Sequence, residues 1–237
     1  MTKSAAADAA AGFVAGPAHK AVPVIDWTAT GWQVMNNCKF SRRRMLGAMA
    51  GAGALCAMPR AGAQPPGVRE VEGFRFDSTL RLHGEDLVLN GVGVRKRFFL
   101  PIYVAGLYVP RRSEDAEVLL AQRGPRRMSM RFVREVEADL FMNSLLDGMR
   151  RNYGAAQLDS WRVQIDTLST VIRTMVMARR GDHVSWDYSP LDGARVMQNS
   201  LPRVPAVQGE DFYNAVLRVW LGAQPADVEL KRGLLGG

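Results

Sequence analysis

Alternation of apolar and polar residues marks strands soon after residue 70. The alternation runs over residues 74–82, breaks at residues 83–86 (HGED) and then resumes, which predicts two strands joined by a tight turn. Asn90-Gly91 is a turn dipeptide, because both residues tolerate the positive φ that a two-residue hairpin loop requires. We therefore expect a turn there and a further strand from Val92.

Two later apolar segments predict strands of different exposure. Residues 98–109 (FFLPIYVAGLYV) are too apolar for one side to face water, so they predict a central strand, and Pro101 indicates a bulge or an irregular start. Residues 126–133 (RRMSMRFV) alternate cleanly and predict a half-exposed strand. Strands are also expected at 183–188 and 194–199, on either side of a turn-rich connector.

The period becomes helical from Glu137. Apolar and small residues recur at helical spacing up to a stop at Gly154, and a second stripe runs over 158–175. Two further helices are expected, over 210–221 and from Pro225 through Leu234. No linker separates these pieces, so the pattern predicts one α+β domain with a largely antiparallel sheet and helices on one face.

The segment before residue 64 has the order of an export signal. A basic cluster precedes the apolar run 45–58, and small residues follow at Ala61-Gly62-Ala63. Its core, Ser41, Arg42, Arg43 and Leu46, matches the Ser-Arg-Arg-x-x-Leu pattern of twin-arginine signals. The apolar run has 14 residues, whereas a membrane-spanning helix needs about 20. We therefore expect no stable membrane anchor.

Three parts of the chain follow from this reading. Residues 1–34 are expected to be a non-native or disordered extension, with Met35 as the start, and residues 35–63 a twin-arginine signal peptide. Residues 64–237 are then the mature domain, released into the periplasm by cleavage after Ala63, with Ala61 as the other small residue of the cleavage site. The expected partner for this step is the twin-arginine export machinery.

Composition becomes less extreme once the predicted signal is set aside. The formal charge of +8 includes seven basic and two acidic residues among the first 63, and the remaining chain carries +3. A nucleic-acid partner is therefore not expected. Both cysteines, Cys38 and Cys56, also precede the predicted cut, so the mature domain would have neither a disulfide nor a thiol nucleophile.

The common catalytic and metal-binding motifs are missing from this sequence. It contains no GxSxG, P-loop, GxGxxG or HExxH motif, and no close His/Asp/Glu spacing that indicates a metal site. Neither a metal nor a cofactor is predicted. His83 and His183 are the histidines after residue 63, and they are expected at the surface. Because haem iron accepts His and Met ligands, haem binding stays open as a minor hypothesis.

Three segments of the chain together resemble the chalcone isomerase family. They are residues 89–96 (LNGVGVRK), the strand that ends Ala-Gly-Leu-Tyr-Val, and the C-terminal pattern GEDF…VWLG followed by residues 225–235. The resemblance spans most of residues 70–236. It implies an open-faced β-sandwich, with a long antiparallel sheet, a helical layer on one face and an apolar cleft between them. Plant members use this cleft to cyclise a chalcone, and other members bind fatty acids without catalysis.

The resemblance also assigns site positions. Arg95 corresponds to the arginine that stabilises an anionic oxygen, and Tyr103 to a threonine that organises the substrate ketone. On the first long helix the family's tyrosine corresponds to Leu145, its lysine to Gly148 and its asparagine to Asn152. Asn152 also fits a helix C-terminal cap, Arg95 also fits a structural arginine, and Tyr103 also fits a core residue.

Several methionines could fill the core or line an apolar ligand site, Met149 on the long helix among them. The leading hypothesis is therefore a periplasmic chalcone isomerase-like protein that binds a small apolar or aromatic ligand, a fatty acid or a phenolic. Arg95, Tyr103, Asn152 and Met149 are the expected ligand-binding residues. The alternative is an intramolecular lyase or isomerase acting on a chalcone-like enone, with Arg95 and Tyr103 as catalytic residues.

Overall fold

The computed structural model describes residues 67–237. Its strands are β1 (Val68–Val71), β2 (Phe74–Asp77), β3 (Thr79–Leu82), β4 (Glu85–Arg97), β5 (Leu100–Val109), β6 (Arg126–Phe132), β7 (Val136–Glu137), β8 (Met177–Ala178), β9 (His183–Ser189), β10 (Gly193–Gln198) and β11 (Leu201–Val207). Its helices are α1 (Ala116–Ala121), α2 (Ala138–Asn152), α3 (Ala155–Ser160), α4 (Arg162–Arg173), α5 (Glu210–Leu221) and α6 (Val228–Leu234). The predicted extension, export signal and cleavage site lie outside the described residues.

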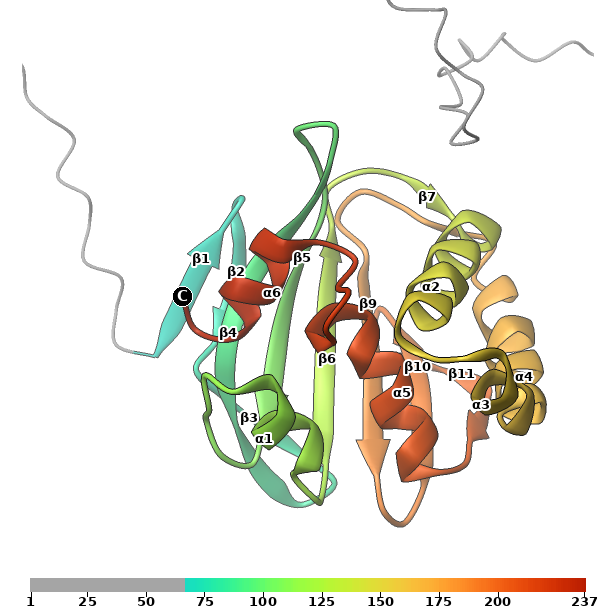
Figure 1. Cartoon of the computed structure of the whole chain (residues 1–237). Helices are drawn as coiled ribbons and strands as arrows, with labels where there is room; N and C mark the ends of the chain where they lie inside the picture. Colours follow the sequence, from blue (N-terminus) through green and yellow to red (C-terminus); the bar gives the residue numbers. More distant parts are fainter. Residues whose placement is uncertain (1–66) are drawn as a thin grey trace, which may run out of the picture. The chain divides into compact units, whose positions relative to one another are not determined.

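One antiparallel sheet organises the fold (Figure 1). Its strand order is β11-β10-β9-β6-β5-β4-β3, and each neighbouring pair is antiparallel. The larger hydrophobic core lies between one face of this sheet and the helices, because α1, α2, α4, α5 and α6 all contribute buried side chains to it. The predicted α+β class, with the helical layer on one face of a long antiparallel sheet, is confirmed.

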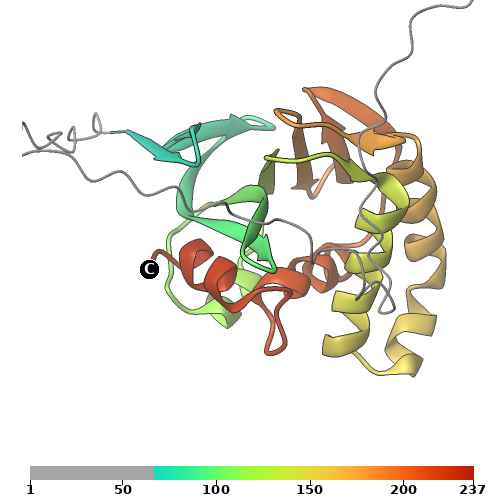
Figure 2. The same cartoon turned by 90° about the horizontal axis from the view of Figure 1, so that it is seen from above.

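A short hairpin covers part of the other face. Strands β1 and β2 pair with each other, and Figure 2 shows them on the opposite side of β4 and β5 from α6. Phe76 of β2 is buried in a second, smaller core together with Leu89, Val104 and Tyr108. Gly106 of β5 makes room for it, because a Cβ there would lie 2.7 Å from Cδ1 of Phe76.

The predicted turn at Asn90-Gly91 is wrong, since both residues lie inside β4. The pairing of β4 with β5 shifts its register between Leu89 and Gly91. The Asn90 side chain donates a hydrogen bond to the Leu234 carbonyl at 2.7 Å, and a Cβ on Gly91 would overlap the Gly233 carbonyl. The dipeptide thus serves the close packing of α6 on β4 instead of reversing the chain.

The predicted central strand starts two residues later than expected. β5 begins at Leu100, and Phe98 and Phe99 form the connection to β4, with φ values of 47° and 67°. Their hydrophobicity predicted that both residues lie inside the sheet, but their side chains are 75% and 97% exposed. The irregularity predicted at Pro101 is confirmed, because the register shifts between Arg95 and Lys96, opposite this part of β5.

The remaining expectations are met to different degrees. α5 has the predicted bounds, whereas the second helical stripe is divided into α3 and α4 at Trp161. In β6 the predicted alternation is present, with Met128, Met130 and Phe132 in the larger core. The strand is not half-exposed as predicted, because it lies inside the sheet between β5 and β9, and Arg126 and Ser129 are buried as well. The strands β1, β7, β8 and β11 and helix α1 were not predicted. Among the described residues, no helix has the length and apolar character needed to span a bilayer.

Candidate functional site

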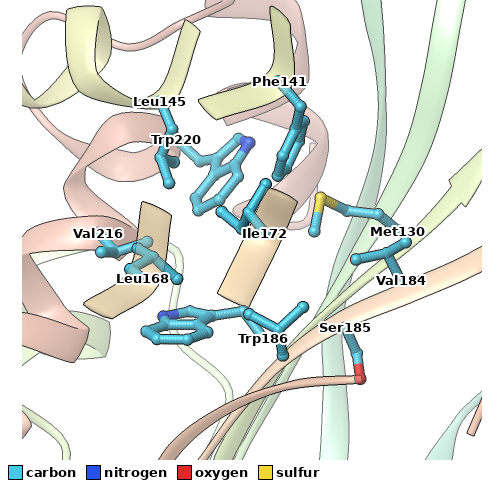
Figure 3. A pocket seen from close by; sticks show the side chains of 11 residues that line it. Met130, Phe141, Leu145, Leu168, Ile172, Val184, Ser185, Trp186, Val216 and Trp220 are labelled. Atoms are coloured by element: carbon cyan, nitrogen blue, oxygen red, sulfur yellow. The ribbon is translucent and has the colours of Figure 1, made fainter. Parts of the chain in front are cut away.

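A small apolar cavity lies inside the larger core, between the sheet and helices α2, α4 and α5 (Figure 3). Its volume is about 20 Å³. The wall is formed by Met130, Phe141, Leu145, Leu168, Ile172, Val184, Ser185, Trp186, Val196, Val216 and Trp220. All of these residues are buried except Phe141, which is partly exposed. Phe141 is therefore the part of the wall that can open to solvent with the least disturbance.

The indole of Trp186 brings an unusual polar group to this wall. Its Nε1 is buried and has no hydrogen-bond partner among the described residues. In Figure 3 this nitrogen lies on the edge of the ring nearest Leu168 and Val216, which also line the cavity. An unpaired buried N–H costs about 1–3 kcal/mol. A ligand atom that accepts this hydrogen bond would recover that free energy.

The second indole of the wall, that of Trp220, is hydrogen-bonded to a polar group outside the wall. Trp220 Nε1 donates a hydrogen bond of 2.9 Å to the hydroxyl oxygen of Tyr103. Burial raises the pKa of Tyr103, although the Trp220 hydrogen bond and the Arg95 charge act in the opposite direction. Tyr103 is thus a neutral phenol at physiological pH. Its own hydroxyl proton stays available to a further acceptor.

Arg95 faces Tyr103 from the neighbouring strand, since the two residues are paired in the register of β4 and β5. Its Nη1 donates to the Lys96 carbonyl at 2.8 Å and to Asp227 Oδ2 at 3.3 Å. Its Nε and Nη2 make no hydrogen bond within residues 67–237, so one fork of the guanidinium is unused. This fork has the geometry that binds a carboxylate with two parallel hydrogen bonds.

Asp227 holds Arg95 at this position while also capping α6. Its Oδ1 accepts hydrogen bonds from the backbone N–H groups of Glu229 and Leu230, and its Oδ2 accepts one from the Lys96 backbone at 3.0 Å. Burial alone would raise the pKa of Asp227, but these backbone hydrogen bonds and the Arg95 charge lower it. The carboxylate is therefore ionised and fixes the arginine next to the site.

Asn152 and Met149 lie on α2 but not in the cavity wall. The Asn152 amide donates to the carbonyls of Gly148 and Gln224, both at 2.9 Å, and its oxygen accepts from the Gln224 backbone at 3.2 Å. This network ties the end of α2 to the segment between α5 and α6. Met149 is fully buried in the larger core. Both side chains therefore support the position of α2 in this state.

The two family positions without polar groups have clear structural roles. Leu145, which the sequence resemblance matches to the family's tyrosine, lines the cavity with an apolar side chain. At Gly148 a Cβ would lie 2.5 Å from Cγ1 of Val219 on α5. A lysine at this position would force α2 and α5 apart, so the close contact between the two helices requires the glycine.

Both histidines lie away from the cavity wall. His83 Nδ1 is 3.0 Å from Asp192 Oδ2, and His183 Nε2 is 2.8 Å from Ser129 Oγ. Burial and the nearby charges of Arg131 and Arg127 lower the pKa of His183 to about 4. Within the described part of the chain, no three His, Cys, Asp or Glu side chains gather in a way that would hold a metal ion.

Sequence reasoning did not assign a site role to Trp186, Trp220, Phe141 or Asp227. Trp220 was recognised only as an apolar position of α5, and Phe141 only as one of α2. No local motif marks an indole whose N–H remains unpaired, because the residues that surround it in the cavity wall come from several separate elements. The facing pair of Arg95 and Tyr103 was found through the family resemblance.

Comparison with known proteins places this geometry in a family. The crystal structure of a fatty-acid binding protein from Arabidopsis thaliana aligns with a TM-score of 0.53 and 14% sequence identity, over 69% of this chain and 92% of that one. At this identity the likeness concerns the fold. No curated protein matches the sequence. The model of the chalcone isomerase-like family matches residues 68–236, and the chain belongs to this family.

Proposed function

We propose that this protein binds a small, largely apolar ligand with one anionic group, a fatty acid or a phenolic, between the sheet and the helices. The observation that carries the proposal is an apolar cavity whose wall is hydrogen-bonded, through Trp220 and Tyr103, to the strand pair that contains Arg95. The apolar part of the ligand occupies the cavity. Its anionic group pairs with the unused fork of Arg95.

Binding on this proposal requires the cavity to widen. Its volume of about 20 Å³ is far below the roughly 300–1,000 Å³ of typical ligand sites. Phe141 is the partly exposed side chain of the wall, and Met130 has a flexible thioether that can repack around an irregular ligand. The described state is therefore the closed one, and we expect α2 to move when a ligand enters.

Trp186 favours a ligand with an acceptor oxygen in its apolar part. A single buried water needs two to four polar partners. The described wall offers it one unpaired side-chain donor, Trp186 Nε1, because the side chain of Ser185 points away from the cavity (Figure 3). A water is thus a poor partner here. A ketone, ether or phenol oxygen on an aromatic ligand satisfies the indole, while a saturated fatty acid chain does not.

The family and the sequence support the setting of this function. A structural neighbour is named as a fatty-acid binding protein, which supports an apolar ligand for this chain. We further propose that the twin-arginine machinery exports the folded domain to the periplasm after recognising Arg42 and Arg43, and that cleavage follows Ala63. The mass of the exported protein tests the cleavage site.

Native mass spectrometry of the protein recovered from cells, followed by titration calorimetry, tests the ligand proposal. We expect a bound mass of a fatty acid or a phenolic, and binding of the matching pure compound. Arg95→Gln should weaken that binding at least about tenfold, since hydrogen bonds between charged groups are lost. Arg150→Gln is the matched control, because Arg150 is exposed on α2 and its partner there is the equally exposed Asp147. Equal affinities of the two variants would contradict the role of Arg95.

A second candidate function is intramolecular addition to an enone. It is favoured by the pairing of a permanent cation, Arg95, with a neutral phenol, Tyr103, since both can stabilise a developing oxyanion. Turnover of phenolic enones that is lost in Arg95→Gln, with the fold intact, would support it. Binding of the same compounds without turnover would favour the binding protein.

A further inference from the structure

The connection between β4 and β5 exposes two adjacent phenylalanines. Arg97 pairs with Leu100 in the register, so Phe98 and Phe99 are the two residues of the hairpin loop. Their side chains are 75% and 97% exposed. Figure 1 shows this loop standing out beyond the neighbouring parts of the sheet. Two phenylalanines side by side at a projecting tip are costly in water, because most of their apolar surface stays exposed.

The backbone of the tip is also unfavourable for these residues. Both have positive φ, 47° and 67°, a region that suits Asn-Gly and is costly for bulky side chains. The chain thus holds phenylalanine where a polar turn dipeptide would favour both folding and solubility. Strain at two adjacent exposed aromatic residues supports a functional role for the loop.

Basic residues stand next to the two phenylalanines. Lys96 is exposed, and the Arg97 guanidinium lies over the Phe98 ring at 5.6 Å from its centroid. Aromatic residues flanked by lysine and arginine are typical of segments that lie in the interface of an anionic lipid bilayer.

The tip and the mouth of the candidate site lie at the same end of the sheet. Arg95 and Tyr103 pair close to the tip, and Tyr103 pairs in turn with Phe132, whose ring contacts Phe141 of the cavity wall with centroids 6.0 Å apart. Leu201, 64% exposed, starts β11 at this same end. A surface that receives the tip would therefore also face the route into the cavity.

We propose that the loop formed by Phe98 and Phe99 inserts into the surface of an anionic lipid membrane and orients the protein there with the mouth of its site toward the lipid. The phenylalanine rings enter the boundary between headgroups and acyl chains, while Lys96 and Arg97 remain at the headgroup phosphates. This docking does not depend on what ligand the cavity takes, so it stands or falls separately from the proposed function.

A site-specific fluorophore tests the insertion. Cys38 and Cys56 are replaced by serine in the full chain, and the thiol-reactive dye NBD is attached through Phe99→Cys or, as a control, through Leu191→Cys. Leu191 is equally exposed, at 93%, but lies in the β9–β10 connection at the other end of the sheet. With vesicles of phosphatidylglycerol and phosphatidylcholine, we expect a blue shift and quenching by spin-labelled lipid at position 99 and neither at position 191.

Binding measurements with unlabelled variants make the test quantitative. Phe98→Ser combined with Phe99→Ser should lower the vesicle partition coefficient at least about tenfold relative to Leu191→Ser. Lys96→Gln should lower it about fivefold on anionic vesicles and little on pure phosphatidylcholine. An unshifted fluorophore at position 99 would overturn the proposal, and so would a shift caused by a protein partner but not by lipid.

Discussion

The contact between α2 and α5 gives the sharpest quantitative prediction. Replacing Gly148 with alanine places a Cβ 2.5 Å from Cγ1 of Val219, 3.1 Å from its Cγ2 and 3.2 Å from its Cβ. Valine has one strongly preferred rotamer in a helix and is 3% exposed here, so it cannot turn away. Overpacking of a core costs about 1–3 kcal/mol.

Helix propensity acts in the opposite direction. Alanine is favoured over glycine in a helix by about 1 kcal/mol, and Gly148 lies in the last part of α2. Because three atoms of a rigid side chain are too close, the packing cost should lie in the upper part of its range. The expected net result is a loss of about 1–2 kcal/mol in the free energy of unfolding.

Urea unfolding monitored by circular dichroism measures this loss. Gly154→Ala is the control, because nothing lies within 4 Å of a Cβ at that position and its φ of −71° suits alanine. The loss caused by Gly148→Ala should be smaller when Val219 is also replaced by alanine, since the two closest contacts, to Cγ1 and Cγ2, are then removed. This corresponds to a coupling of about 0.5–3 kcal/mol between the two sites. If Gly148→Ala is as stable as the unchanged protein while Val219 is present, the proposed close contact is wrong.

Three further changes test other parts of the structure. Tyr103→Phe leaves the buried Trp220 N–H without its acceptor, so urea unfolding should show a loss of about 1–3 kcal/mol, and an unchanged stability would mean that the hydrogen bond is absent. Phe141→Ala opens the partly exposed part of the cavity wall, so the ligand should associate faster in stopped-flow mixing experiments. An unchanged association rate would mean that the ligand enters elsewhere. The pKa of His183 is lowered to about 4 from an ordinary value near 6.5, mainly by burial. The unfolded chain therefore binds the proton more readily than the folded one, and the free energy of unfolding should fall as the pH falls from 6.5 to 4. In His183→Gln this contribution, about 2–3 kcal/mol, should be missing, and parallel pH profiles for the two proteins would contradict it.

Periodicity was sufficient for elements whose burial pattern is local. α5 has eight buried residues on 12 positions with acidic residues in its first turn, so both its stripe and its start are visible in the sequence. The alternation of β6 likewise separates the residues of the two sheet faces. In α5 the local pattern and the final packing agree, and the prediction was correct. In β6 the strand and its alternation were predicted correctly, but the predicted exposure of one face was wrong, since Arg126 and Ser129 are buried.

Prediction failed where a distant segment decides the conformation. Asn90-Gly91 has strong turn propensity, but α6, more than 130 residues later, packs its backbone against Gly91 and accepts a hydrogen bond from Asn90. Phe98 and Phe99 are apolar and were placed in a strand, because hydrophobicity alone does not distinguish a buried side chain from one exposed for a partner. Both errors arise from tertiary or functional demands that a window of residues does not contain.

The candidate site likewise has residues that the sequence could predict and residues that depend on tertiary contacts. The family motif in β4 located Arg95, and the register of β4 with β5 shows why Tyr103 faces it. The unpaired N–H of Trp186 could not be predicted, since it depends on which side chains fail to reach that atom. Asp227 could have been suspected as a helix N-cap, but its contact with Arg95 joins residues 132 positions apart.

One face of α2 connects the glycine at position 148 with the closed cavity. Phe141, Leu145 and Gly148 are spaced at four and three residues, so they lie on the same face of α2. The glycine lets this face approach α5, and the approach brings Phe141 and Leu145 into the wall that also contains Trp220. The glycine at position 148 therefore also narrows the space available to a ligand. Gly148→Ala should then lower the free energy of unfolding and, by moving α2 outward, raise the rate of ligand association. A lower stability together with slower association would show that the contact between α2 and α5 does not control access to the cavity.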